Sequence, residues 1–61
     1  MAAQNSITQH TLAERITRLA VSLKWSDAEV LAEVQRQAKA AGVAELTLRG
    51  LVRERLAAAA H

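Results

Sequence analysis

Residues 18–25 decide between two folds for this chain, because their apolar positions fit both the period of a strand and that of a helix. Polar and apolar side chains alternate through the segment, as in a β-strand, with apolar residues at Leu19, Val21, Leu23 and Trp25. The same residues also extend a helical stripe formed by Leu12, Ile16, Leu19 and Leu23. A strand here predicts a ribbon followed by two helices, whereas a helix predicts a small three-helix domain.

The length of the chain predicts one domain with a small core. Domains of about 60 residues bury only about 60% of the surface that their unfolded chain exposes. Hydrophobic residues make up 51% of the 61 residues, but 14 of them are Ala, which contribute little burial. The chain has no Cys, so no disulfide adds stability. We therefore expect self-association, most simply as a homodimer, to supply part of the stability.

Several classes of protein are excluded by the sequence. The first ten residues contain neither the basic nor the apolar region of a signal peptide. No apolar run approaches the ~20 residues of a membrane span, so we expect a cytoplasmic protein with no membrane partner. The net charge of +2 permits binding to nucleic acid without requiring it.

Residues that carry catalysis or bind metals are also missing from the sequence. The two His residues, His10 and His61, lie in polar or terminal segments, and without Cys they predict no metal site. The two glycines stand apart at Gly42 and Gly50, so no glycine-rich loop can hold a phosphate. The six carboxylates are scattered over positions typical of a helix surface. We predict no catalytic residues, no cofactor and no enzymatic activity.

The order of elements follows from capping signals. Residues 1–10 are polar and lack periodicity, which predicts a flexible N-terminal arm before a single helical domain at 11–61. Thr11 and Glu14 fit a capping box, which predicts a helix that begins at Leu12. This box reinforces the apolar stripe at 12, 16, 19 and 23, so we favour an all-α, small three-helix domain that forms a dimer. The alternative is a ribbon-helix-helix dimer with residues 18–25 as the strand.

Two more helices follow with clearer boundaries. Ser26 and Glu29 form a second capping box, and Gly42 can take the left-handed conformation that ends a helix, which together predict a helix over 27–41. Its predicted apolar face consists of Val30, Leu31, Val34, Ala38 and Ala41. The last helix spans roughly 45–59 and is capped either at Thr47 or just before Glu45. Its predicted apolar stripe consists of Leu48, Leu51, Val52 and Leu56.

The strand interpretation rests on a resemblance. The alternation from Val21 to Trp25, the apolar spacing from Val30 to Gly42, and the segment Leu51 to Leu56 resemble ribbon-helix-helix repressors of the Arc and MetJ type. The resemblance implies a dimer in which residues 18–25 of two chains pair as a ribbon in the major groove of DNA. It also implies that the polar face of the ribbon, with Arg18, Ser22 and Lys24, reads the bases.

The helical interpretation has a DNA-binding version of its own. Ala38, Gly42 and Val43, followed by Leu48 and Leu51, resemble a helix-turn-helix, although Gln37 stands where an apolar residue is expected. The resemblance implies that Arg49 and Arg53 lie on the recognition helix. Across both interpretations the candidate DNA-binding residues are Arg18, Ser22, Lys24, Lys39, Arg49 and Arg53.

Two functions remain open at this point. The first is a small DNA-binding protein, a transcriptional or plasmid/phage maintenance regulator that binds duplex DNA through these basic residues. The second is a helical protein–protein interaction module, such as an adaptor, inhibitor or antitoxin, with a protein partner and no DNA contact. In the second case the basic residues form a solvated surface, on which Arg15 and Arg18 pair with Glu14 and its neighbours.

Overall fold

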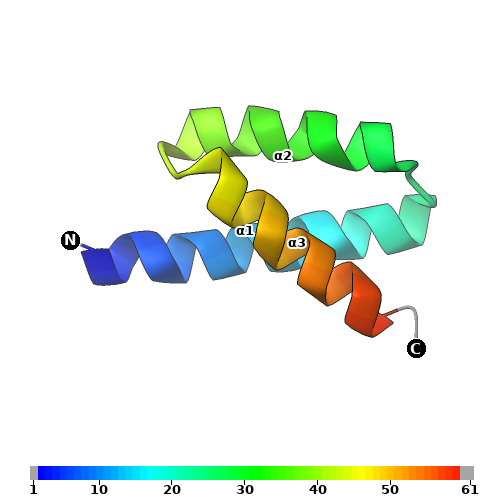
Figure 1. The fold of residues 1–61 in the computed structure, drawn as a ribbon, viewed down its shortest axis with the longest axis horizontal. Coiled ribbons are helices and arrows are strands. Elements are labelled where there is room, and N and C mark those ends of the chain that lie inside the picture. The colour runs from blue at the N-terminus through cyan, green and yellow to red at the C-terminus, as the bar shows by residue number, and fades with distance from the viewer. Residues whose placement is uncertain (1, 60–61) are drawn as a thin grey trace.

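The chain folds into three helices, as the three-helix interpretation predicted. A computed structural model describes the backbone of residues 2–59 and the side chains of residues 7–59. The helices are α1 (Ala2–Leu23), α2 (Asp27–Ala41) and α3 (Glu45–Ala59). Helix α2 runs back above α1, and α3 crosses α1 diagonally, packing against it more extensively than against α2 (Figure 1). The described residues contain no strand, so residues 18–23 complete α1 and the alternative ribbon at 18–25 is not formed.

Helix α1 begins earlier than the sequence predicted. It starts at Ala2 and not at Leu12, so Thr11 lies inside the helix and the capping box predicted with Glu14 does not form. The first ten residues contain neither Gly nor Pro, so nothing in them interrupts helical backbone hydrogen bonding. Residues 2–10 therefore form the first turns of α1, while the predicted division into a flexible arm and a domain stays a prediction.

The ends of α1 and α2 are closed in the same way. The backbone N–H of Trp25 donates to the carbonyl of Ala20 at 3.0 Å, and that of Val43 donates to the carbonyl of Ala38 at 3.0 Å. In each case the residue before the donor has a positive φ, 55° at Lys24 and 71° at Gly42. This arrangement satisfies carbonyls at the end of a helix and reverses the chain. The predicted role of Gly42 is confirmed, and Lys24 performs it without being a glycine.

The start of α2 is also as predicted. The backbone N–H of Glu29 donates to Ser26 Oγ at 3.3 Å. In return, the backbone N–H of Ser26 donates to Glu29 Oε1 at 3.2 Å. Both halves of the capping box are therefore present. Helix α3 starts at Glu45, so Thr47 lies within its first turn and is not the cap.

The core is narrower than the apolar stripes predicted. Its buried residues are Leu12, Ala13, Ile16 and Ala20 from α1, Val30, Val34 and Ala38 from α2, and Leu48 and Val52 from α3. In α1, Leu19 and Leu23 are 42% and 59% exposed, while Ala13 and Ala20 are buried. The predicted stripe is therefore wrong at its C-terminal end. The small side chains of Ala13 and Ala20 let another helix come close to α1, which places the buried face toward them and turns the leucines outward.

Candidate nucleic-acid interface

Helices α2 and α3 form a helix–turn–helix unit joined by residues 42–44. Ala38 on α2 and Leu48 on α3 are 2% and 0% exposed, and Val43 in the turn packs against the same core. Leu51, the last apolar position of the predicted pattern, is partly buried there as well. The positions that the pattern expects to be apolar thus hold the two helices together, and the left-handed Gly42 lets the chain turn between them.

Gln37, the one departure from the pattern, is accommodated by a hydrogen bond on α2. Its side-chain amide donates to Glu33 Oε2 at 2.7 Å. Arg36 donates to the same carboxylate, with its Nε 3.1 Å from Glu33 Oε1. The hydrogen bond from Arg36, followed by the one from Gln37, lowers the pKa of Glu33 below its usual value, and Glu33 in turn raises the pKa of Arg36. A partly buried amide at position 37 therefore has a partner, and Arg36 is already engaged.

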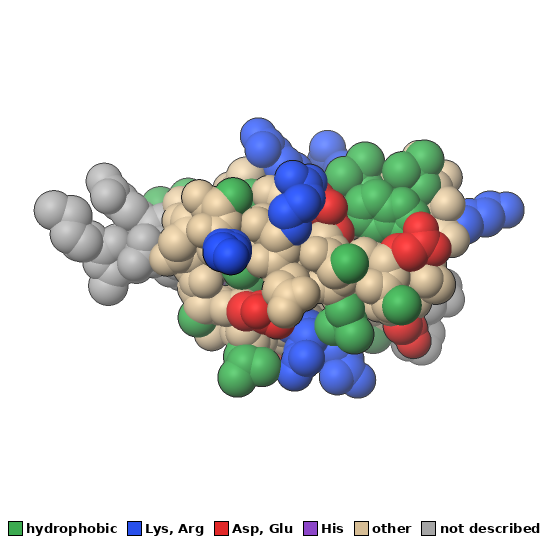
Figure 2. Space-filling view, turned by 90° about the horizontal axis from the view of Figure 1, so that it is seen from above, with side chains coloured by type: hydrophobic (Ala, Val, Ile, Leu, Met, Phe, Trp, Pro, Cys, Tyr) green, Lys and Arg blue, Asp and Glu red, His purple; other side chains and the backbone are tan. Residues whose placement is uncertain are grey.

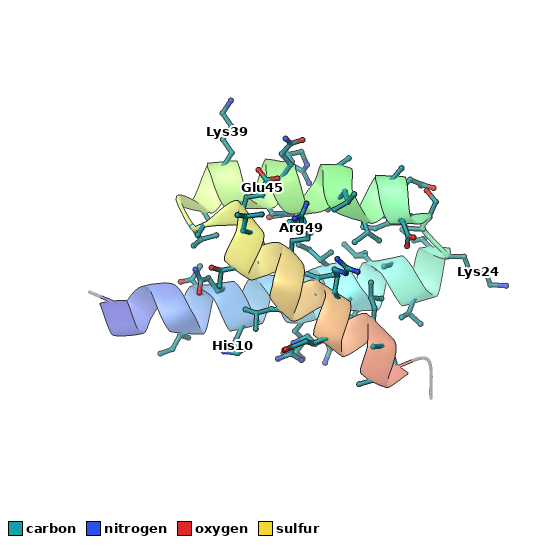
Figure 3. The ribbon with its side chains drawn as sticks, viewed as in Figure 1. His10, Lys24, Lys39, Glu45 and Arg49 are labelled. Carbon is teal, nitrogen blue, oxygen red and sulfur yellow. The ribbon has the colours of Figure 1, made fainter. Side chains whose placement is uncertain are left out.

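The side of α3 that borders α2 carries two arginines, Arg49 and Arg53, that form no ion pair among the described residues. Arg49 and Arg53 are four residues apart and lie on the same side of the helix as Leu46 and Gly50. Among the described residues, ion pairs form between Arg18 and Glu14 and between Arg36 and Glu33, and none involves Arg49 or Arg53. Arg49 extends from α3 toward α2 (Figure 3). This face can therefore offer two guanidinium groups to an anionic ligand.

A groove runs between α3 and the N-terminal half of α2. Its apolar lining comes from Val30 and Leu31 of α2 and from Leu56 of α3. Asp27 lies on the α2 wall, and Arg49 and Arg53 lie on the α3 wall. Leu31 was predicted to belong to the buried face of its helix, yet it is 43% exposed, because it opens into this groove and not into the core.

The other candidate DNA-binding residues lie elsewhere. Arg18 and Ser22 are exposed on the side of α1 opposite its buried residues, and Arg18 Nη2 is 2.8 Å from Glu14 Oε1, as the interaction-module interpretation predicted. Lys24 extends from one end of the molecule, and Lys39 points outward near the other end of α2 (Figure 3). Of the six predicted residues, the structure brings together Arg49 and Arg53.

The surface over α2 also carries its basic side chains at separate places. Basic side chains stand at several places around this face and do not merge into one patch (Figure 2). Apolar side chains gather toward one end of it, beside acidic ones (Figure 2). Any nucleic-acid interface on this molecule is therefore better sought on a single element, such as α3, than on a broad basic surface.

Sequence reasoning missed the groove as a unit. Leu31 and Leu56 were predicted to lie on the apolar faces of their helices. Their periodicity does signal that each faces the interior side of its helix, but no pattern within one helix reveals where two helices diverge. Leu46 was also missed, and at 70% exposure it is the most exposed large apolar side chain on α3.

Within the described residues, no three His, Cys, Asp or Glu side chains gather into a group that could hold a metal ion. Among those residues there is also no helix long and apolar enough to cross a membrane. No protein-family model matches the chain, and neither a curated protein nor a solved structure shows significant similarity to it.

Proposed function

We propose that this protein binds duplex DNA through the α2–α3 unit, with α3 as the helix that enters the major groove. The observation that supports the proposal is the side of α3 that borders α2, where Arg49 and Arg53 stand one turn apart without an ion pair among the described residues. A helix fits the major groove of B-DNA, and Arg donates well to guanine O6 and N7 or to phosphate oxygens.

The turn at Gly42 gives each helix a separate role in this proposal. Helix α3 carries Arg49 and Arg53 into the major groove, where they can reach base edges and the phosphates that border the groove, while α2 lies across the sugar-phosphate backbone. Lys39 lies three residues before Gly42 and extends into solvent (Figure 3), so we assign it a phosphate contact. Arg18, Ser22 and Lys24 belonged to the ribbon prediction and are not part of this surface.

The biological role that fits is a small regulator of transcription or of plasmid or phage maintenance, working in the cytoplasm where its DNA is found. We also propose that it is a homodimer. The core supports this part of the proposal, because nine of the described residues are buried and three of those are Ala. A core of this size leaves a domain marginally stable without association.

A salt titration tests the proposed function. A fluorescein-labelled random-sequence duplex is titrated with the protein, and anisotropy is recorded at several salt concentrations. Binding through phosphates predicts an affinity that falls linearly on a log–log plot with a slope of about −0.9 for each phosphate neutralised. Arg49→Ala and Arg53→Ala should each weaken binding and reduce the slope by about 1 for each phosphate contact removed.

Lys24→Gly is the matched control. It also removes one positive charge, and glycine keeps the left-handed conformation that this position requires. We expect it to leave the slope unchanged, because Lys24 lies at the end of the molecule away from Arg49 (Figure 3). If Lys24→Gly weakened binding as strongly as Arg53→Ala, the assignment of the interface to α3 would be wrong.

The second candidate function is a protein–protein interaction module without DNA contact. The groove between α2 and α3 favours it, because Val30, Leu31 and Leu56 offer an apolar lining that DNA does not need. Absence of any anisotropy change at low salt, with the protein folded by circular dichroism, would exclude the DNA-binding proposal and leave this one.

A further inference from the structure

The groove between α2 and α3 has features that DNA binding leaves unexplained. Its lining is apolar, and Leu31 within it keeps 43% of its surface exposed. Exposing a large apolar side chain in a concave surface costs free energy that a second apolar surface can recover. The small core, with nine buried residues in the part of the chain that the structure describes, makes such a recovery important.

The charges on the two walls of the groove are opposite. Asp27 stands on the α2 wall, and Arg49 and Arg53 stand on the α3 wall. No ion pair joins Asp27 to either arginine among the described residues, although all three line the same groove. The groove therefore offers an anionic side and a cationic side, each available to a charge of the opposite sign.

We infer that the face around this groove, with the exposed Leu31 and the two charged walls, is a self-association surface that packs against the same face of a second copy of the chain. In a contact with twofold symmetry, each surface patch meets its own copy in reverse order. The Asp27 wall of one copy then faces the Arg49 and Arg53 wall of the other, twice over. The exposed Leu31 side chains meet between these walls, so apolar burial and charge complementarity act together.

Self-association through this groove competes with DNA. Arg49 and Arg53 belong both to the groove and to the surface proposed to enter the major groove, so one copy cannot use them for both at once. Duplex DNA should therefore dissociate the dimer, and this consequence, unlike the interface itself, rests on the proposed DNA binding. A dimer that holds its DNA-reading arginines in its interface would be the DNA-free form of the protein.

A charge-exchange experiment tests the interface. Sedimentation equilibrium of the full chain, without DNA, gives the dimer dissociation constant for the wild type and for Asp27→Lys and Arg53→Glu. Each reversal places like charges opposite one another, so each should weaken the dimer by at least ~10-fold. In an equimolar mixture of the two variants, the mixed dimer has opposite charges at both wall contacts, one formed by the native Asp27 and Arg53 and the other by the two reversed residues. It lacks the like-charge pairs of each homodimer, so association should return to within about threefold of the wild type.

Matched controls separate the groove from a general charge effect. Glu54→Lys and Arg15→Glu make the same changes of charge at exposed positions outside the groove, and both should associate like the wild type. Because Asp27→Lys also removes an acidic residue from the first turn of α2, Leu31→Gln serves as an uncharged second variant. It should weaken the dimer while circular dichroism stays helical.

Three results would overturn the inference. They are a wild-type chain that stays monomeric up to about 1 mM, groove variants that associate no differently from the controls, or a mixture of the two reversals that does not recover. None of these depends on DNA. If the dimer behaves as expected and duplex DNA neither binds nor dissociates it, the proposed function fails and the self-association surface stands.

Discussion

The two glycines of this chain should respond to the same substitution with opposite signs. Gly50 lies inside α3, is exposed, and a Cβ added to it would meet nothing within 4 Å. Neither packing nor a clash then contributes to Gly50→Ala, so the difference in helix propensity decides the outcome. Ala is more favourable than Gly in a helix interior by about 0.8–1.0 kcal/mol, and we expect Gly50→Ala to stabilise the fold by about that much.

Gly42 differs from Gly50 in its backbone conformation and not in the space available for a Cβ. A Cβ there would also meet nothing within 4 Å, but φ is +71°. A residue with a Cβ loses about 1–2 kcal/mol in the left-handed region. The lower entropy of the unfolded chain returns about 0.4–1 kcal/mol of this loss. Gly42→Ala should therefore destabilise the fold by about 1 kcal/mol.

Thermal and urea unfolding followed by far-ultraviolet circular dichroism measure both effects. For a domain of this size, 1 kcal/mol corresponds to about 4–8 °C in Tm, so the two variants should lie on opposite sides of the wild type and well apart. All three proteins are compared at one concentration, because self-association makes Tm depend on concentration. If both variants shifted Tm in the same direction, either the helical position of Gly50 or the left-handed conformation of Gly42 would be wrong.

Three further perturbations follow from the contacts of individual residues. Ser26→Ala removes the side-chain acceptor for the backbone N–H of Glu29 and should cost about 1 kcal/mol in urea unfolding, with helicity lost first at the start of α2. Leu48→Ala empties a fully buried site and should cost about 2–5 kcal/mol, enough to leave much of the chain unfolded at room temperature. The lowered pKa of Glu33, caused mainly by Arg36, means that its carboxylate stabilises the fold above its ordinary pKa. That contribution should disappear as pH falls from about 4.5 through the lowered value, and Glu33→Gln should flatten the pH dependence of unfolding there; an unchanged profile would argue against the pair.

The capping signals could be interpreted from the sequence because they act over a few residues. Ser26 and Glu29 are three positions apart, and the hydrogen bonds between them need only the first turn of one helix. Gly42 likewise ends α2 through a bond that spans five residues. The same local logic failed at Thr11, because a capping box can form only where a helix starts, and α1 had already started at Ala2.

The segment 18–25 could not be assigned from its sequence, because its apolar residues satisfy both periods. What differs between the two outcomes is the packing partner. In the structure, α3 packs on α1 and the chain buries Ala13 and Ala20, two small residues that no apolar stripe would select, while Leu19 and Leu23 stay partly exposed. Burial of a small residue depends on which helix crosses it, and that is not encoded in the period of one segment.

The candidate site, too, has one part that follows from the sequence and another that follows from the packing of the helices. The spacing of Arg49 and Arg53 is one turn, so the sequence already places them on one face of a helix, and Gly42 already separates this helix from the one before it. That these arginines face Asp27 across an apolar groove, and that Lys24 and Lys39 lie apart from them, follows from the packing of the helices. A spacing along one helix fixes the angle between its side chains, whereas a groove depends on how two helices diverge, which is set by the buried contacts that join them.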